Sequence, residues 1–397
     1  MSSATHGPAG TRPAPDQSPG TDLLPGIGHI VILMKENHSF DNYFGMLGRG
    51  DGFSVDAAGR PTNSNPDTDG HPVLVHHLDS PWQPWHGLDQ HWNASHLQWN
   101  NGANDGFVRT THSTAPMGYW TEQDLPFYYG LASAFPIADR YFASCLGQTF
   151  PNRRFLQAGT ARGLVSTRLP NPLEPNPPAG TVWDQLDRHQ VSWRNYFVEL
   201  PEIGLYPQVL LGHLGNAKPI ADFYGDCRSG HLPEVSLLTP DLFVVSEGET
   251  QDVQIGETFT ASIVDAVLNG PEWARTMLII TYDEGGGYYD HVPPPAAVPP
   301  DEVPPAIRVP PDQPGGYDRL GFRVPCIIVA PFARADHVSH VVYDHTSILK
   351  TIQRKWNLPA LTRRDAAAHD LLDLLDLTGP PAFLIPPELP RPGLHRP

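Results

Sequence analysis

The chain has 397 residues, of which 40% are hydrophobic, enough for the core of one large domain or of two ordinary ones. Its 43 acidic and 26 basic residues give a formal net charge of −17. This charge argues against a broad nucleic-acid surface and against attraction to anionic membranes. We therefore expect no nucleic-acid partner, and any anionic ligand must be held locally by a metal ion or by a few placed cations.

Both ends of the chain differ in composition from its middle. Residues 1–24 are rich in Pro, Gly, Ser and Thr, which predicts a disordered tail, and residues 381–397 form a second, Pro-rich tail. We expect a single domain over residues 25–380. The N-terminus lacks the basic start and apolar core of a secretion signal, and no run of eighteen apolar residues occurs, so we expect a soluble, cytoplasmic protein without an integral membrane segment.

The first half of the chain begins with a strand. An apolar run over residues 29–34 predicts a buried strand, and a long polar and aromatic region follows over 50–125. Helical patterns come next, over 126–143 and around 152–160. A helix and then a strand are expected over 181–199, with Thr181 as the helix N-cap.

The second half repeats a helix next to a strand. A helix through Phe259 and Leu268 ends at Asn269-Gly270-Pro271, and an apolar strand follows over 277–282. Further on, RVPCIIVAPF predicts a strand and HTSILKTIQRKW a helix, while the Pro-rich stretch 292–316 predicts a surface excursion. This alternation predicts one doubly wound α/β domain with long insertions.

Two of the expected strands end in acidic pairs. The first runs into Glu36 and Asn37, and the second into Asp283 and Glu284. Ligands bind beyond the carboxyl ends of parallel strands, and carboxylate and amide oxygens suit a hard divalent ion, so the two pairs can converge on one cation. The competing interpretation is that each pair merely caps a turn or helix.

Between these pairs lies SCLGQTFPNRRFLQAGT, in which Thr149 precedes Pro151 and a helix. A hydroxyl at a helix N-terminus is close to backbone N–H groups that stabilise a phosphate, so Thr149 is a candidate nucleophile. On local evidence alone, a plain helix N-cap is the commoner role for such a threonine.

The chain resembles the bacterial phospholipase C and acid phosphatase group of phosphoesterases, within the alkaline phosphatase superfamily, which also includes the plant non-specific phospholipases C. The resemblance covers most of residues 25–376. It rests on ENHSFDNYFG, WNNGANDGFV, MGYWTEQDLPFYYGLASAF, TFPNR, TYDEGGGYYDHVPPP, RVPCIIVAPF and DHTSILKTIQRKW. It implies an alkaline-phosphatase-like fold, with a mostly parallel central sheet and helices on both faces.

The resemblance also implies roles for individual residues. Glu36 and Asn37 match one metal-binding pair of the family, and Asp283 and Glu284 match the other. Thr149 stands where the family keeps a nucleophile that also approaches the metal. The cofactor is then a divalent metal ion whose identity the ligand set leaves open.

Histidines are candidates for phosphate binding and for protonating a leaving alkoxide. His291 and His345 follow strands within the family blocks, and either one could be the proton donor. His91 and His96 lie in a segment similar to the family's histidine-and-tryptophan segment and, with Asn152, are candidates for binding the substrate phosphate. For any single histidine, a structural role remains the commoner one.

One segment departs from the family pattern. Family members usually carry a Glu-His-Pro-Pro type segment before the helix that leads to the second acidic strand, whereas this chain has SEGETQDV at 246–253. An active-site histidine is therefore expected to be missing, and His231 is a conceivable substitute. Aromatic residues over 82–129 could hold a choline headgroup, but such stretches are more often ordinary packing.

The sequence thus predicts a metal-dependent phosphoesterase, most simply a phospholipase C that acts through a phospho-threonine intermediate. The substrate is then a phospholipid or another phosphate ester. A phosphomonoesterase of the acid phosphatase kind and a catalytically silent phosphate-ester-binding relative remain as alternatives. Relatives in this group are often exported, which leaves the localisation open.

Overall fold

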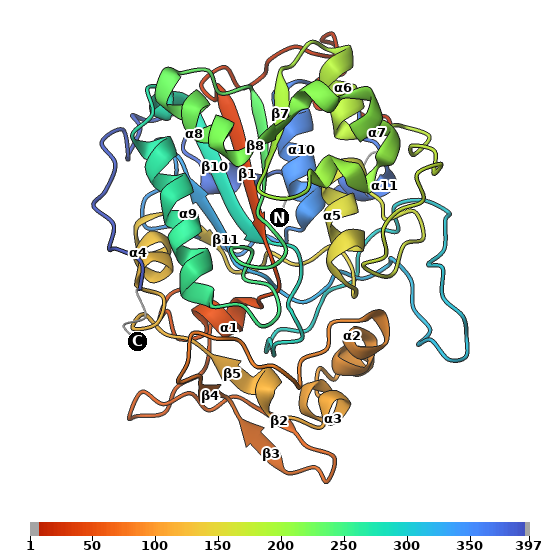
Figure 1. Ribbon diagram of the computed structural model, residues 1–397, viewed down its shortest axis with the longest axis vertical. Helices are drawn as coiled ribbons and strands as arrows, with labels where there is room; N and C mark the ends of the chain where they lie inside the picture. The colour runs from red at the N-terminus through yellow and green to blue at the C-terminus, as the bar shows by residue number, and fades with distance from the viewer. Residues whose placement is uncertain (1–7, 394–397) are drawn as a thin grey trace.

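The computed structural model describes residues 8–393 and is built around an eight-stranded sheet (Figure 1). The strand order is β12-β6-β11-β10-β1-β9-β7-β8. The strands are β1 (His29–Lys35), β6 (Ile137–Ala138), β7 (Trp193–Phe197), β8 (Ala217–Pro219), β9 (Val235–Thr239), β10 (Thr276–Tyr282), β11 (Cys326–Val329) and β12 (Val338–Ser339).

Most neighbouring strands of this sheet run parallel. β8, β7, β9, β1 and β10 form one continuous parallel block. β11 is antiparallel to both β10 and β6, and β12 is parallel to β6. The expected mostly parallel α/β sheet is therefore confirmed, and the strand predicted in RVPCIIVAPF is its antiparallel member.

Helices cover both faces of the sheet (Figure 1). On one side α8 contacts α9 and α9 contacts α4; on the other side α5 contacts α10 and α6, and α10 contacts α11. Their bounds are α4 Pro126–Ala134, α5 Thr149–Ala158, α6 Val182–Arg188, α7 Pro207–Gly212, α8 Ile220–Ser229, α9 Val253–Leu268, α10 His345–Lys355 and α11 Arg363–Ala367. Short 3-10 turns span Asn100–Gly102, Ala115–Met117, Glu202–Leu205, Leu214–Asn216, Trp273–Arg275 and Leu371–Leu374.

The polar and aromatic region 50–125 forms most of a smaller lobe beyond the carboxyl end of β1, at the bottom of Figure 1. It holds two small two-stranded sheets and short helices. These elements are α1 (Phe40–Phe44), β2 (Ser64–Pro66), β3 (Pro72–Leu74), β4 (His76–His77), α2 (Trp92–Trp99), α3 (Phe107–Thr111) and β5 (Gly118–Tyr119). The lobe therefore covers the sheet edge at which the two acidic pairs are expected.

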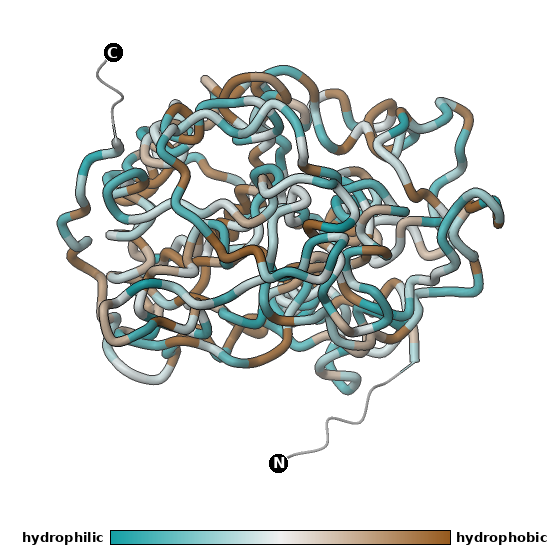
Figure 2. Tube along the Cα trace, turned by 90° about the horizontal axis from the view of Figure 1, so that it is seen from below, coloured by the Kyte–Doolittle hydropathy of each residue, from teal (hydrophilic) through white to brown (hydrophobic). Residues whose placement is uncertain are grey.

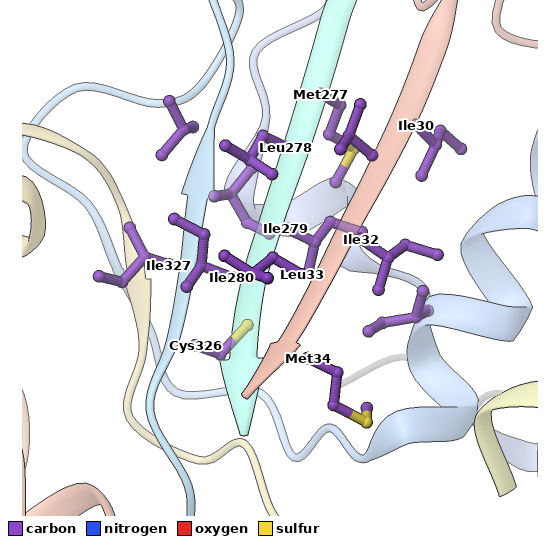
Figure 3. Close-up of a cluster of buried hydrophobic side chains, with 14 of the residues drawn as sticks. Ile30, Ile32, Leu33, Met34, Met277, Leu278, Ile279, Ile280, Cys326 and Ile327 are labelled. Carbon is purple, nitrogen blue, oxygen red and sulfur yellow. The ribbon is translucent and has the colours of Figure 1, made fainter. Parts of the chain in front are cut away.

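The core is built on β1 and β10 (Figure 3). Every residue of β10, and all of β1 after His29, is buried, as expected for central strands with helices on both faces. Figure 3 shows Leu33, Ile279 and Ile280 grouped around β10 near Ile327, while Ile32 extends to the side of β1 away from β10. This rigid centre fixes the positions of the residues that follow each strand.

Two predicted helix boundaries were wrong. The helix expected over 126–143 ends at Ala134, because Pro136 disfavours helical geometry at Phe135, and the chain continues as β6. The helix expected around 152–160 begins three residues earlier, at Thr149. Gln148, not Thr149, is its N-cap residue, so the interpretation of Thr149 as a helix N-cap was wrong.

The segment expected to be a disordered tail over 1–24 is held against the domain where the structure describes it. The Asn357 side chain donates to the carbonyls of Ala14, Gln17 and Ser18, and the backbone N–H of Leu23 donates to the carbonyl of Lys355. These bonds supply the ordering that the composition alone lacks. Residues 1–7 lie outside the described residues, and the domain limits at 25 and 380 stay a prediction.

Within residues 8–393, no helix is both long and apolar enough to cross a membrane.

Candidate metal centre and active site

The two acidic pairs meet at the carboxyl ends of β1 and β10. These strands are parallel neighbours, and Lys35 is the register partner of Tyr282. The next residues along each strand are therefore Glu36 and Asp283, and then Asn37 and Glu284. All four side chains are buried, and we call them the doublet cluster. The prediction that the pairs lie together is confirmed.

Arg153 of α5 joins the two pairs from one side. Its Nε donates to Asp283 Oδ2 at 2.9 Å, and one terminal nitrogen lies 3.4 Å from Glu36 Oε1. The other terminal nitrogen donates to Glu202 Oε2 at 2.5 Å. One guanidinium thus serves three carboxylates, and negative charge remains in excess.

Asn37 points its side-chain amide at both carboxylates of the second pair. One end of the amide lies 3.0 Å from Glu284 Oε1 and 3.3 Å from Asp283 Oδ1. With nitrogen at that end, the amide donates to both carboxylates; with oxygen there, three oxygens converge, an arrangement that a cation makes favourable. The donor set fits a divalent metal ion, with Glu36 beside it on the neighbouring strand.

Burial and mutual repulsion set the electrostatics of the doublet cluster. Burial raises the pKa of Glu36 to about 8, with the Arg153 guanidinium opposing that rise and Asp283 adding to it. Burial, with the neighbouring Asp283 carboxylate, also raises the pKa of Glu284 well above its ordinary value. Groups that resist ionisation in this way gain from a bound cation.

Two unusual backbone conformations shape this corner. Asn37 has a φ of 69°, a left-handed conformation that asparagine tolerates better than most residues. Gly286 has a φ of 66°, and a Cβ there would lie 2.1 Å from the Asn37 carbonyl oxygen. Glycine is therefore required for the loop after β10 to pass so close to the end of β1.

Thr149 is the first residue of α5 and is buried. Its hydroxyl forms no hydrogen bond with another described residue. Arg153 lies one helical turn further along the same face of α5, and Arg153 contacts Asp283. The neighbouring Phe150 lines one cavity together with Glu36. Through Arg153 and Phe150, the first two turns of α5 therefore lie beside the doublet cluster.

Asn152 is fully committed to the loop that precedes α5. Its Oδ1 accepts from the Cys145 backbone N–H, and its Nδ2 donates to the carbonyls of Gly147 and Gln148, each at 3.0 Å. This geometry fixes the loop that leads into Thr149. Asn152 was predicted to bind the substrate phosphate, but these contacts leave its amide turned toward the loop and not toward a phosphate.

His345 lies behind the doublet cluster. Its Nε2 is 2.7 Å from the Asp283 carbonyl oxygen and its Nδ1 is 3.2 Å from the Tyr141 hydroxyl. Burial lowers its pKa to about 4, so the ring is neutral near neutral pH. The histidine therefore supports the backbone of Asp283, with neither ring nitrogen open to a substrate.

His291 belongs to a second group of buried charges. Its Nδ1 lies 2.7 Å from Asp41 Oδ2 and its Nε2 lies 3.3 Å from Asp51 Oδ1. Arg323 donates to Asp41 at 2.9 Å and to Asp290 at 2.8 Å. We call Asp41, Asp290, His291 and Arg323 the Arg323 cluster. Both nitrogens of His291 are engaged there, and the structure does not bring this histidine into contact with the doublet cluster.

The Arg323 cluster also has the spacing of a metal site. In the part of the chain that the structure describes, one group of His, Cys, Asp or Glu side chains brings three possible ligand atoms within 4.8 Å of one another. Its members are Asp41, Asp290 and His291. Arg323 already bonds both aspartates, however. A cation placed there would have to displace or repel the guanidinium, so the donor chemistry favours the doublet cluster.

His91 has an open ring nitrogen. It immediately precedes α2, its Nδ1 is 2.8 Å from Asp89 Oδ1, and its side chain is 68% exposed. This contact with the Asp89 carboxylate raises the pKa of His91. Asp89 in turn lies against the doublet cluster's own loop, because a Cβ on Gly287 would lie 2.7 Å from the Asp89 nitrogen.

His96 is held away from such a role. Its Nδ1 lies 2.7 Å from the Trp92 carbonyl oxygen, and its ring packs on the Trp92 indole with ring centres 4.2 Å apart. The Pro-rich excursion closes over it, since a Cβ on Gly315 would lie 2.2 Å from His96 Nε2. The structure therefore does not show His96 open to a phosphate.

The segment 246–253 reaches the doublet cluster even though it departs from the family pattern. The Glu36 backbone N–H donates to the Ser246 carbonyl, and a Cβ on Gly248 would lie 3.0 Å from Glu36 Oε2. Glu249 follows on the surface, and its charge acts on both Glu36 and Glu284. Glycine at 248 thus allows the backbone of this segment to pass close to Glu36, where a side chain would crowd the carboxylate.

His231, considered as a substitute for the missing histidine, lies at the wrong end of the sheet. It precedes β9, whose first residue Val235 pairs with Ile30 near the start of β1. The doublet cluster lies beyond the other end of β1. The distance along the parallel strands excludes His231 from the site.

Sequence reasoning missed Arg153, Glu202 and Glu249. Arg153 stands in the TFPNR block, and its position four residues after Thr149 places it on the same helix face, which was an available signal. Glu202 and Glu249 lie in loops, and their approach to the doublet cluster depends on tertiary contacts alone.

Comparison with known proteins identifies the family of the chain. The model of the Phosphoesterase family matches residues 27–359. "Phospholipase C A" of Mycobacterium tuberculosis is 33% identical, covering 97% of this chain and 84% of that protein. "Non-specific phospholipase C1" of Arabidopsis thaliana is 28% identical, covering 91% of this chain and 73% of that protein.

Among solved structures, a protein in the alkaline phosphatase superfamily from Vibrio parahaemolyticus has a TM-score of 0.38 and 10% identity, covering 79% of this chain and 73% of that chain. The family match spans β1 through α10 and includes both acidic pairs and Thr149. The chain therefore belongs to the Phosphoesterase family and is a hydrolase of phosphate esters.

Proposed function

We propose that the chain is a metal-dependent phospholipase C that cleaves the phosphodiester of a phospholipid on its glycerol side. The observation that carries the proposal is the contact of Arg153 of α5 with Asp283 and Glu36, one helical turn from Thr149 at the start of that helix. The similarity to proteins named phospholipase C from bacteria and a plant supports the substrate class.

The metal ligands are Glu36, Asn37, Asp283 and Glu284, with the Thr149 hydroxyl completing the set. Their oxygen donors suit a hard divalent ion. Such an ion, when bound, supplies positive charge to a phosphate and lowers the pKa of a nearby hydroxyl. Arg153 fixes the spacing of the two strand ends, since it contacts Asp283 and Glu36 together.

The Thr149 oxygen attacks phosphorus in line, forming an O–P bond while the bond from phosphorus to the glycerol oxygen breaks. The backbone N–H groups at the start of α5 stabilise the negative charge on the phosphoryl oxygens. Water then attacks phosphorus from the side that the glycerol oxygen left, and the bond from phosphorus to the Thr149 oxygen breaks, which releases the phosphorylated headgroup and restores the hydroxyl.

His91 is the residue that we assign to protonate the departing glycerol oxygen. Both ring nitrogens of His291 and of His345 are engaged, whereas the Nε2 of His91 is open and its Nδ1 is oriented by Asp89. The contact with Asp89 raises the pKa of His91 and so favours the protonated ring that a proton donor needs. His91→Asn therefore lowers kcat far more than it changes KM.

The test compares Thr149→Ala with Thr149→Ser. The alanine variant loses hydrolysis of phosphatidylcholine while elemental analysis still finds the metal, and the serine variant keeps partial activity because it retains a hydroxyl. Acid-quenched protein incubated with phosphate-labelled substrate carries label on residue 149 only when a hydroxyl is present. Full activity in Thr149→Ala would exclude Thr149 as the nucleophile.

The same assay separates the alternatives. A phosphomonoesterase hydrolyses a simple phosphomonoester much faster than phosphatidylcholine, and a silent binding relative shows no turnover on either while retaining metal. The mostly apolar cavity beside Glu36 favours an ester with a bulky apolar alcohol.

A further inference from the structure

A cavity opens directly beside the doublet cluster and has mostly apolar walls. Its volume is about 180 Å³, and Glu36, Arg153 and Glu202 line its inner end. Leu205 and Leu210 form part of its wall. The cavity thus begins where a substrate phosphate would be bound and leads away along apolar side chains.

Three segments that contribute to the cavity lining, 169–173, 198–214 and 242–244, also carry exposed apolar side chains, which we call the apolar rim. Leu169, Leu200 and Leu242 belong both to the cavity lining and to the exposed surface. Leu173 is 85% exposed and Phe243 is 71% exposed. Single exposed apolar residues are ordinary, but a group of them around one opening indicates an interaction surface.

Hydrogen bonds tie the three segments to one another and to the sheet. The Gln208 side chain of α7 donates to the Pro172 carbonyl at 3.0 Å, and the Val198 N–H donates to the Thr239 carbonyl at 3.0 Å. Asp241 accepts from the backbone N–H groups of Phe243 and Val244. The rim therefore has a fixed shape.

The rim lies beside the carboxyl ends of the parallel strands, where β7 and β9 end at Phe197 and Thr239. Figure 2 views the molecule from the end toward which β1 and β10 point in Figure 1, and brown hydrophobic stretches alternate there with teal ones. The apolar rim and the doublet cluster thus share one end of the sheet, joined by the cavity.

We propose that the apolar rim docks on the surface of a zwitterionic phospholipid bilayer and that one lipid enters the cavity with its glycerol and acyl end while its phosphate reaches the doublet cluster. This inference rests on the proposed phospholipase function. Apolar side chains gain free energy by leaving water for the acyl boundary of a bilayer. The net charge of −17, with Glu199 in the cavity lining, selects against anionic lipid surfaces.

The test replaces Leu173 and Phe243 by serine, singly and together, and measures vesicle binding and hydrolysis. Both side chains are exposed, so the substitutions leave the core intact. Binding to phosphatidylcholine vesicles is measured by co-sedimentation in a Thr149→Ala background, where turnover cannot change the vesicles. Each substitution lowers binding about tenfold, because each removes one side chain from the acyl boundary.

Hydrolysis is then measured with Thr149 intact on two forms of one lipid. Activity on phosphatidylcholine vesicles falls with binding, while activity on short-chain phosphatidylcholine below its critical micelle concentration stays within about twofold. Ile385→Ser is the matched control, because Ile385 is 87% exposed and lies outside the rim. Adding phosphatidylserine to the vesicles weakens their binding by the protein with the unsubstituted rim.

The outcomes separate this inference from the proposed function. Equal vesicle binding by the rim variants and the Ile385→Ser control overturns the docking surface, even where short-chain phosphatidylcholine is hydrolysed. Rim-dependent vesicle binding without hydrolysis of either lipid form overturns the phospholipase function and leaves the docking surface standing. A rim that captures a protein but not vesicles also overturns the inference.

Discussion

Two groups of buried carboxylates follow strands β1 and β10, and they differ in how their charge is balanced. In the Arg323 cluster, one guanidinium bonds Asp41 and Asp290, and His291 bonds the remaining oxygen of Asp41. In the doublet cluster, Arg153 is shared by Glu36, Asp283 and Glu202, and Glu284 takes its bond from the Gly286 N–H.

Short distances between possible ligand atoms therefore do not identify a metal site by themselves. The Arg323 cluster has the closer set of ligand atoms, yet its charges are already paired. The doublet cluster retains excess negative charge and an amide aimed at two carboxylates. A buried group with unbalanced charge is costly unless an ion completes it, which is why we propose the metal at the doublet cluster.

The largest expected effect comes from breaking the doublet cluster at Asp283. Asp283→Asn removes one charge and lowers kcat/KM about 10³-fold or more, because several kcal/mol of transition-state stabilisation depend on the metal. Elemental analysis of the purified variant finds less metal than in the parent. The matched variant Asp290→Asn keeps its metal and loses stability instead. Metal lost from Asp290→Asn and retained in Asp283→Asn would place the ion in the Arg323 cluster.

The next effect is on stability and tests the Arg323 cluster. Arg323→Met leaves Asp41 and Asp290 buried without their partner and lowers the free energy of unfolding by about 3–5 kcal/mol. Chemical denaturation measures this loss. Arg140→Met is the control, because the ion pair of Arg140 with Asp51 is partly exposed and costs less than about 1 kcal/mol to remove. Equal losses in the two variants would show that Arg323 balances no buried charge.

A smaller effect is expected behind the doublet cluster. His345→Phe removes the ring nitrogen that lies 2.7 Å from the Asp283 carbonyl oxygen and lowers metal affinity about 10- to 100-fold, as for other residues that orient metal ligands. Metal titration measures the change, and excess metal restores most of kcat. A loss of kcat that excess metal cannot restore would indicate instead that His345 acts on the substrate.

The sequence was sufficient for four of the eight strands, β1, β7, β10 and β11, and for the approach of the two acidic pairs, whereas β6, β8, β9 and β12 were not predicted. Apolar runs predicted β1 and β10, and parallel neighbours necessarily bring the residues after their last positions together. Pro136 could also have placed the end of α4, since the residue before a proline disfavours helical geometry.

The roles of the histidines could not be predicted in this way. His291 and His345 both follow strands within recognisable motifs, yet their partners are Asp41, Asp51 and the Asp283 carbonyl, which come from distant parts of the chain. Whether a ring nitrogen is open depends on these tertiary contacts, not on spacing. For the same reason the anchoring of residues 8–24 by Asn357 was not visible in their composition.

The smallest expected effect is a pH dependence of metal affinity that distinguishes the two clusters. Without metal, the pKa of Glu36 is raised to about 8, so below that pH the carboxyl holds a proton that a metal ion must displace. Affinity therefore rises with pH, by up to about tenfold per unit for one proton released, and levels off above the raised pKa. Calorimetric titrations in buffers of different ionisation enthalpy count the proton.

The metal-free protein shows the opposite trend in stability. The folded state holds this proton to a higher pH than the unfolded chain does, so stability falls as pH rises from the ordinary glutamate range toward 8. Glu36→Gln reduces both trends, and the part that remains belongs to Glu284, whose pKa is also raised; an unchanged slope in that variant would assign the proton to Glu284 alone.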